Sequence, residues 1–248
     1  MTSAKPWYQT FFHDFRPLFG ILPQKRTHEH IRFIIKKLGL RKGSRFLDCP
    51  CGIGRIALPL AAKGIRVTGV DLSQEYLDEL AATAKKRRLK IELERADMRR
   101  VTFDRRFDAA ANLWTSFGYF ENDAEEMKTI RAMYRALKPG GKFLLHVINR
   151  DYIIAHYTPS DVIECGDVFS FEERKFDYAT SVNKGVWRFL KDGKLSSHNI
   201  GIRMYSYHEL IAMFRKAGFV DIEGFGGTKD EPISRDSSMM FVVGTRPE

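Results

Sequence analysis

The sequence predicts a three-layer α/β sandwich, in which helices cover both faces of a mostly parallel seven-stranded sheet. Three observations carry this prediction. Short apolar segments alternate with amphipathic segments from residue 45 to residue 149, the same pattern returns at 206–244, and the connections are short. Such alternation is typical of a parallel sheet that is covered on both sides.

Five of the seven strands are expected before residue 150 and two after residue 218. Their ranges are 45–50, 66–72, 91–97, 107–113, 142–149, 219–225 and 239–244. Ser73, Asn122 and Ser206 have side chains that cap helix N-termini, and the last two each precede a glutamate by three residues, as in a capping box. Gly64 and Gly218 end two helices, because glycine tolerates the left-handed conformation found there.

The segment 151–204 does not follow this pattern and contains no convincing amphipathic helix. Its Asp192-Gly193 pair favours positive φ and predicts a hairpin turn. Three strands are expected around it, at 168–178, 181–190 and 195–204. We therefore predict a core made of residues 1–150 and 205–248, with an N-terminal helical lid, and an antiparallel β insertion at 151–204.

Composition limits the classes of partner. The chain has 41 Lys and Arg against 31 Asp and Glu, a net charge of +10, which favours anionic partners such as nucleic acid. The basic runs at 85–88, 99–100 and 105–106 have no interleaved aromatic residues for base stacking, so a solvated charged surface is preferred. Three cysteines predict no disulfide framework. Without a secretory leader or an apolar run of ~20 residues, we expect a cytoplasmic protein with no membrane segment.

The strongest chemical signal is residues 46–55, Phe-Leu-Asp-Cys-Pro-Cys-Gly-Ile-Gly-Arg, where a buried strand ends in a glycine-rich turn and a helix begins. Glycine lets a ligand approach the backbone, and the helix N-terminus offers free N–H groups at the edge of the sheet where such folds bind ligands. Asp71 ends the next strand, 23 residues beyond Asp48. This position suits a carboxylate that accepts hydrogen bonds from ribose hydroxyls, and the alternative is a residue that only starts a helix.

Asp97 and Met98 follow the third strand. Asp97 would accept a hydrogen bond from an adenine amino group while Met98 packs on the ring, and an acidic loop residue is the competing interpretation. A dinucleotide-binding loop usually has a third glycine where this chain has Ala57. The helix-strand-loop-strand ending of the chain also differs from the mostly parallel continuation of a dehydrogenase.

Together with Phe107-Asp108 and the Pro-Gly-Gly of 139–141, these motifs resemble the class I S-adenosylmethionine-dependent methyltransferases over nearly the whole chain. Pro50 replaces the usual glycine, as in a subgroup with the pattern Asp-x-Pro-Cys-Gly-x-Gly. The resemblance implies a Rossmann-like class I methyltransferase fold, in which the last strand of the seven-stranded sheet is antiparallel. It also implies S-adenosyl-L-methionine as cofactor and S-adenosyl-L-homocysteine as product. It also implies that the insertion caps the substrate site, as in related small-molecule N-methyltransferases.

The resemblance further implies roles for individual residues. Asn112 and Leu113, at the end of the fourth strand, would lie beneath the sulfonium and its methyl group. The residues expected to contact the cofactor, from its methionine part through the ribose to the adenine, are Asp48, Cys51, Gly52, Gly54, Asp71, Leu72, Asp97 and Met98.

The expected reaction is an in-line transfer of the methyl group to a nitrogen or oxygen of a small-molecule acceptor, in which alignment contributes about 7–11 kcal/mol. His146, near the carboxyl end of the fifth strand, is the preferred base, with a buried core histidine as the alternative. Tyr119 would orient the acceptor and Tyr8 would belong to the lid. The alternative for Tyr119 is packing within its loop, and the alternative for Tyr8 is an amphipathic helix docked on the core.

Two other functions remain open at this stage. Methylation of tRNA or another RNA would explain the basic runs and requires them to share a face with the pocket. A non-catalytic cofactor-binding partner subunit would have a blocked site at the methyl group. We expect no metal, because Cys49-x-Cys51 and His28-x-His30 have no partner pair with zinc spacing. We expect a monomer or a homodimer, and the sequence does not distinguish the two.

Overall fold

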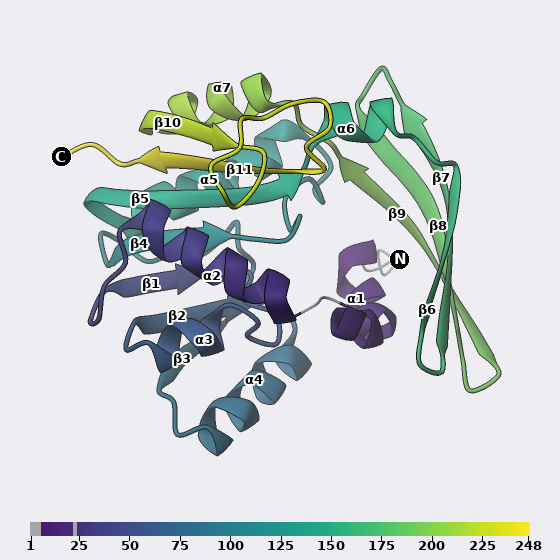
Figure 1. Cartoon of the computed structure of the whole chain (residues 1–248), viewed down its shortest axis with the longest axis horizontal. Coiled ribbons are helices and arrows are strands. Elements are labelled where there is room, and N and C mark those ends of the chain that lie inside the picture. The colour runs from purple at the N-terminus through teal and green to yellow at the C-terminus, as the bar shows by residue number, and fades with distance from the viewer. Residues whose placement is uncertain (1–5, 22–23) are drawn as a thin grey trace, which may run out of the picture.

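A seven-stranded sheet forms the centre of the computed structural model, which describes residues 6–21 and 24–248 (Figure 1). Its strands are β1 (Arg45–Asp48), β2 (Arg66–Asp71), β3 (Ile91–Arg95), β4 (Phe107–Asn112), β5 (Leu137–Ile148), β10 (Val220–Phe225) and β11 (Met239–Thr245). They lie in the order β10-β11-β5-β4-β1-β2-β3. Neighbours from β5 to β3 pair in parallel, whereas β11 is antiparallel to β5 and to β10. The predicted sheet is therefore confirmed. The first five residues, where we expect no secretory leader, lie outside the described part.

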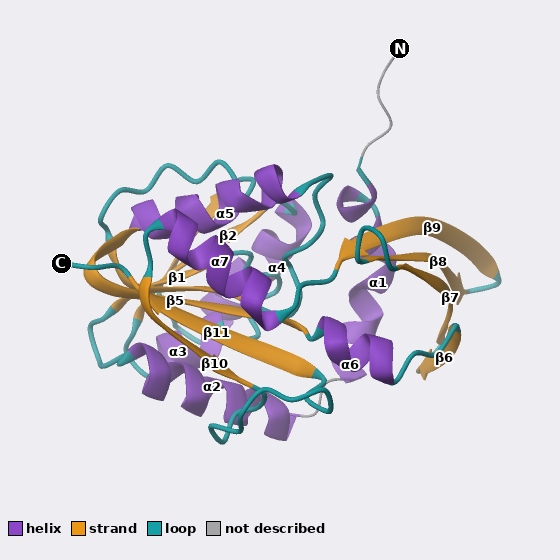
Figure 2. Ribbon diagram, turned by 90° about the horizontal axis from the view of Figure 1, so that it is seen from above, coloured by secondary structure: helices purple, strands orange, loops and turns teal. Residues whose placement is uncertain are grey.

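Helices cover both faces of this sheet. They are α2 (Gln24–Leu38), α3 (Ala57–Ala62), α4 (Gln74–Lys86), α5 (Asp123–Ala136) and α7 (Tyr207–Ala217). Figure 2 shows α2 and α3 on one side of the sheet and α5 and α7 on the other. Successive strand residues point to opposite faces, so Phe46 packs into the cluster with α2, α3 and α4, and Leu47 into the cluster with α5 and α7. The sequence analysis did not single out α2.

Most helix ends lie where the capping residues and glycines of the sequence predict them. Ser73 Oγ accepts a hydrogen bond from Tyr76 N at 3.3 Å. Ser206 and Glu209 form the reciprocal capping box at the start of α7, and Gly218 ends that helix at φ +103°. Each cap satisfies backbone groups that the helix itself leaves without partners. The helix boundaries were therefore readable from short sequence patterns.

A second sheet of four antiparallel strands lies beside the first one. It consists of β6 (Ser160–Cys165), β7 (Val168–Asp177), β8 (Val182–Lys191) and β9 (Lys194–Arg203). The Asp192-Gly193 turn joins β8 to β9, with φ of +51° and +70°. The sequence analysis missed β6, and its expectation of no helix in this segment is wrong for α6 (Arg150–Ala155). Six residues are too few to show a helical period, although Asn149 caps this helix through its side chain.

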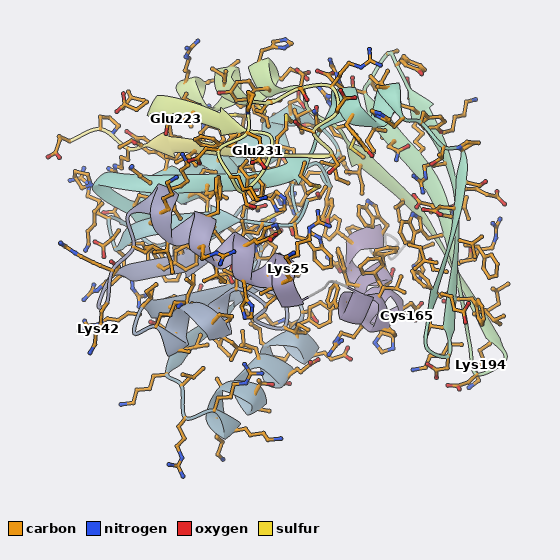
Figure 3. The ribbon with its side chains drawn as sticks, in the orientation of Figure 1. Lys25, Lys42, Cys165, Lys194, Glu223 and Glu231 are labelled. Carbon is orange, nitrogen blue, oxygen red and sulfur yellow. The ribbon has the colours of Figure 1, made fainter. Side chains whose placement is uncertain are left out.

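The N-terminal segment lies between the two sheets (Figure 1). It comprises η1 (Trp7–Gln9), α1 (Phe11–Phe15) and η2 (Arg16–Ile21). Arg16 forms an ion pair with Glu79 on α4, and on the other side Cys165 Sγ donates to Pro17 O at 3.5 Å. Figure 3 labels Cys165 beside this segment, at the end of β6. The segment thus bridges the α/β core and the second sheet. Over the described ranges, no helix combines the length and apolar character needed to cross a bilayer.

Candidate active site

A cavity of about 1130 Å³ opens between the carboxyl ends of the core strands, the N-terminal segment and the second sheet. Pockets for one small molecule measure roughly 300–1,000 Å³, so this volume lies just above that range. Strands β1, β2 and β4 end at the same edge because they are parallel, and their following loops supply one wall. The lining residues used below are Tyr8, Asp48, Cys51, Gly52, Gly54, Arg55, Asp71, Leu72, Asp97, Met98, Leu113, Trp114 and Tyr119.

The turn after β1 leaves its backbone open to the cavity. Gly52 and Gly54 have φ of +53° and +87°, a region that L-residues rarely adopt. A Cβ on Gly54 would lie 2.2 Å from Leu80 Cδ1, whereas a Cβ on Gly52 would meet no atom within 4 Å. Glycine at 54 is thus required by packing, and at 52 by backbone conformation alone.

Asp71 holds this turn in place. Its Oδ2 accepts from Gly52 N at 2.8 Å and its Oδ1 accepts from Ser73 N at 2.9 Å. Burial raises the pKa of Asp71, and the backbone hydrogen bonds oppose that effect. A carboxylate oxygen has two lone-pair directions, so each oxygen can accept a further hydrogen bond from a ligand. Leu72, which follows it, also lines the cavity.

Asp48 is a buried carboxyl group with spare hydrogen-bonding capacity. It is 2% exposed, and its Oδ2 has no hydrogen-bond partner among the described residues. Burial raises its pKa to about 7, opposed by the charge of Arg55. A buried polar atom without a partner is costly unless a ligand supplies one. Asp48 is therefore suited to a cationic or hydrogen-donating ligand group.

The two cysteines of the loop are packing groups. Cys49 and Cys51 are free thiols that are 0% and 7% exposed. A Cβ on Gly69 of β2 would lie 2.9 Å from Cys51 Sγ, which shows how closely the strand approaches this thiol. Burial raises the pKa of both groups, so both stay protonated near neutral pH. Of the two, Cys51 was expected at the cofactor, and it lines the cavity.

Asp97 reaches the cavity but is already engaged. Its carboxylate accepts hydrogen bonds from Arg99 Nε and, at 2.6 Å, from Arg99 Nη2. Burial alone would raise the pKa of Asp97, but these hydrogen bonds outweigh burial and lower it. Met98 lies beside it, and its Sδ accepts from Asn112 Nδ2 at 3.3 Å. Asn112 itself is 0% exposed and does not line the cavity, whereas Leu113 does.

A strained turn follows β4. Trp114 and Thr115 have φ of +61° and +57°, and two consecutive non-glycine residues in this region store strain that tends to occur at functional sites. Trp114 lines the cavity, and its N–H donates to His146 Nδ1 at 3.3 Å. The N–H of Thr115 donates to the carbonyl of His146 at 3.0 Å. His146 therefore supports this turn from behind.

The position of His146 favours a buried core histidine over a catalytic base. The side chain is 1% exposed, does not line the cavity, and stacks on Phe241 with ring centroids 4.1 Å apart. Burial, followed by the nearby charges, lowers its pKa well below the usual value, so the ring is neutral near pH 7. Its Nδ1 accepts from the backbone N–H of Trp114, and its buried Nε2 has no hydrogen-bond partner among the described residues.

The side chains of Tyr8 and Tyr119 pack against each other, and both line the cavity. Their rings stack at 6.4 Å with an interplanar angle of 18°, and Trp7 packs edge-on against Tyr119 at 4.8 Å. Burial raises the pKa of both phenols, so each keeps its proton as a hydrogen-bond donor. The structure thus brings the two predicted tyrosines together, one from the N-terminal segment and one from the loop after β4.

The sequence analysis gave no cofactor or acceptor role to Arg55 and Trp114, which line the cavity, or to His30, whose Nδ1 accepts from Arg55 Nη1 at 3.2 Å. Arg55 directly follows the glycine-rich turn, and a basic residue at that position was a visible signal. His30 and Trp114 reach the site only through the placement of α2 and the conformation of the turn after β4, which no local pattern indicates.

Known proteins share this architecture. Residues 46–141 match the family model described as a methyltransferase domain. A putative methyltransferase of Geobacillus sp. (strain WCH70) is 26% identical over 95% of this chain and 98% of its own length. The putative methyltransferase YqeM of Bacillus subtilis (strain 168) is 32% identical over 61% of this chain and 59% of its own length.

Solved structures agree with this match. An S-adenosylmethionine-dependent methyltransferase from Clostridium acetobutylicum has a TM-score of 0.80 at 19% identity, covering 97% of this chain and 99% of that one. The S-adenosylmethionine-bound CalS10, an amino pentose methyltransferase from Micromonospora echinaspora, has a TM-score of 0.65 at 20% identity, covering 98% and 99%. Residues 46–141 therefore resemble a methyltransferase domain, and the chain has the class I methyltransferase fold.

Proposed function

We propose that the protein is an S-adenosylmethionine-dependent methyltransferase that methylates a nitrogen or oxygen of a small-molecule acceptor. One observation carries this proposal: the turn after β1 and the carboxylates of Asp48 and Asp71 line a cavity of about 1130 Å³. The methyltransferase domain and the class I fold support the same reaction. CalS10, whose structure contains S-adenosylmethionine, shares this fold.

The residues of this wall fit the proposed cofactor. Asp48 Oδ2 is an orphaned buried acceptor that suits the ammonium group of the methionine part. Gly52 presents backbone without a side chain. Asp71 can accept from the ribose hydroxyls while it keeps its two backbone hydrogen bonds. Met98 offers an apolar surface to the adenine, with Asp97 at its edge.

When bound, S-adenosylmethionine supplies a methyl carbon that is activated by a positively charged sulfur. The protein's own residues align the acceptor with that carbon and exclude water, and alignment can contribute about 7–11 kcal/mol. The aromatic rings of Trp7, Tyr8 and Tyr119 pack against one another and line the same cavity. Aromatic faces attract cations, including an ammonium acceptor, and exclude water from the reacting atoms. A neutral amine then needs placement more than a strong base.

The walls favour a small acceptor over RNA. Arg99 is neutralised by Asp97 and Glu125, and Arg106 by Glu92, so part of the basic runs is engaged within the protein. The N-terminal segment and the second sheet, which we propose as a lid and a cap over the acceptor, both contribute residues to the lining of the cavity. An amino pentose is the acceptor class named for CalS10, and an amine of similar size suits this cavity.

Isothermal titration calorimetry with S-adenosylhomocysteine tests the proposal. We expect binding to the wild-type protein and about 10- to 100-fold weaker binding to Asp71→Asn, because a hydrogen bond to a charged group contributes roughly 1.5–3 kcal/mol. Asp78→Asn is the matched control, since Asp78 is exposed on α4 and bonds only Gln74 among the described residues. Absence of binding to folded wild-type protein would refute the cofactor. Equal affinities of wild type and Asp71→Asn would refute the ribose role.

A further inference from the structure

The charged side chains that line the cavity come from the α/β core, as Asp48, Arg55 and Glu79 do. The second sheet contributes Trp187, Ile200 and Ile202, which are all apolar. Within the described ranges, no Asp, Glu, Lys or Arg of the N-terminal segment or of the second sheet lines the cavity. These two elements, called the acceptor wall below, therefore offer apolar surface and no fixed charge to an acceptor.

Aromatic rings form most of the acceptor wall. Phe15 of α1 packs edge-on against Trp187 of β8, with ring centroids 5.6 Å apart, and lies 6.5 Å from the ring of Trp114 after β4. Phe11 contacts both Trp187 and Trp7, at 5.4 Å and 5.7 Å. All five rings line the cavity, so aromatic surface continues from the second sheet to the turn after β4. Aromatic rings pack in edge-on or offset-stacked pairs, and this surface suits a flat ring.

Trp187 turns its polar atom away from the cavity. Its Nε1 is buried and has no close hydrogen-bond partner among the described residues. Glu172 lies directly opposite on β7. Burial raises the pKa of Glu172, while Arg174 and the nearby indole N–H oppose that effect. Because the N–H is buried beside Glu172, which does not line the cavity, an acceptor meets the ring of Trp187 and not its N–H.

The loop after β4 and the tyrosines leave few polar groups for an acceptor. Thr115 Oγ1 accepts from a backbone N–H at 3.1 Å, and Ser116 Oγ donates to a backbone carbonyl at 3.0 Å. Burial raises the pKa of Tyr8 and of Tyr119, so each phenol keeps its proton and can donate one hydrogen bond. Two donors suit an acceptor with one or two polar groups. A sugar would bury several hydroxyls, and each one without a partner is costly.

The acceptor nitrogen also has to be uncharged without help from a buried base. His146 does not line the cavity, and the two histidines that do, His13 and His28, are exposed. An amine on an aromatic ring shares its lone pair with the ring and is a weak base, so it is uncharged near neutral pH. An aliphatic amine is mostly protonated there and would first have to lose a proton.

We propose that the acceptor is a flat aromatic amine whose ring packs on Trp187 and on the aromatic side chains of the N-terminal segment. The inference rests on the proposed function and narrows its class of acceptor. In the transfer, the lone pair of the amine nitrogen forms the new N–C bond, and the C–S bond of the methyl donor breaks with its electron pair going to sulfur. The nitrogen then releases one proton to water. Trp187 thereby determines the specificity for the acceptor.

The experiment compares three amines. 2-Aminonaphthalene is flat and aromatic, decahydro-2-aminonaphthalene has the same carbon skeleton without aromatic rings, and glucosamine is an amino sugar. Each amine is titrated by calorimetry into protein saturated with S-adenosylhomocysteine, and its N-methyl product with S-adenosylmethionine is measured by mass spectrometry. We expect 2-aminonaphthalene to bind at least about tenfold more tightly than the other two and to have the highest kcat/KM.

Variants of Trp187 test the specificity role. Trp187→Leu should weaken 2-aminonaphthalene by about 2- to 10-fold, the contribution of one aromatic pair, and change the affinity for S-adenosylhomocysteine by less than about twofold. Phe171→Leu is the matched control, because Phe171 on β7 is 38% exposed and does not line the cavity, so neither affinity should change. Trp187→Phe keeps an aromatic ring and should retain most of the affinity, and it provides the measurement if Trp187→Leu does not fold.

The outcomes are distinct. If folded wild-type protein does not bind S-adenosylhomocysteine, the proposed function fails and the inference fails with it. If the protein binds S-adenosylhomocysteine but 2-aminonaphthalene is not methylated, or binds no more tightly than the other amines, the inference alone is overturned. Equal effects of Trp187→Leu and Phe171→Leu would overturn the role of Trp187, as would an equal loss of both ligands in Trp187→Leu.

Discussion

Replacing His146 by phenylalanine distinguishes a support for the turn after β4 from a catalytic base. Phenylalanine keeps the ring that stacks on Phe241 at 4.1 Å, but it removes Nδ1, the acceptor for Trp114 N at 3.3 Å. The hydrogen bond from Thr115 N to the carbonyl of residue 146 is a backbone interaction and is retained. The substitution thus removes one specific interaction from a buried site.

The expected cost follows from that one interaction. A buried N–H left without an acceptor costs about 1–3 kcal/mol, and it would add to a turn that already holds two residues at positive φ. We therefore expect His146→Phe to lower the free energy of unfolding by about 1–3 kcal/mol. His146→Asn, which keeps an acceptor but loses the ring stack, should lose roughly 0.5–1.5 kcal/mol of aromatic contact instead.

Urea unfolding followed by tryptophan fluorescence measures the stability, with circular dichroism as a second probe to check that the transitions coincide. Histidine NMR measures the protonation of His146 directly. Because burial lowers its pKa well below the usual value, its ring signals should not titrate between pH 6 and pH 8. Titration near pH 6.5, or full stability of His146→Phe, would refute the supporting role and restore His146 as a candidate base.

Two further substitutions test the site and its surroundings. Gly54→Ala should weaken S-adenosylhomocysteine binding and lower the melting temperature, because position 54 has φ +87° and a Cβ there would meet Leu80. The control Gly201→Ala should change both quantities little, because Gly201 has an ordinary φ and its Cβ would make a 3.5 Å contact. Equal effects of the two substitutions would contradict the argument. Glu126 is 0% exposed, accepts from Phe120 N at 2.7 Å, and has a pKa raised by burial to about 7. The folded state holds the proton of Glu126 more tightly than the unfolded state. As pH rises from about 4.5 to 7, the free energy of unfolding of the wild type, measured in urea, should therefore fall relative to that of Glu126→Gln by on the order of 3 kcal/mol. A pH-independent difference between the two free energies would refute the raised pKa.

The sequence by itself determined the α/β core and one wall of the cavity. Strand and helix periods, the capping residues Ser73 and Ser206, and the Asp192-Gly193 turn act through residues that are neighbours along the chain. Because parallel strands bring their carboxyl ends to one edge, Asp48 and Asp71 had to meet there. These features need no knowledge of distant contacts.

Only the tertiary structure decided what faces that wall. The N-terminal segment reaches Glu79 on α4 and Cys165 on β6, residues far from it along the chain. The same kind of contact placed His30 beside Arg55 and turned His146 into the core. Such placements depend on side-chain packing between segments, which local periodicity does not encode. A histidine on a strand has the same sequence signal whether it faces a cavity or a neighbouring ring, and burial alone separated the two for His146.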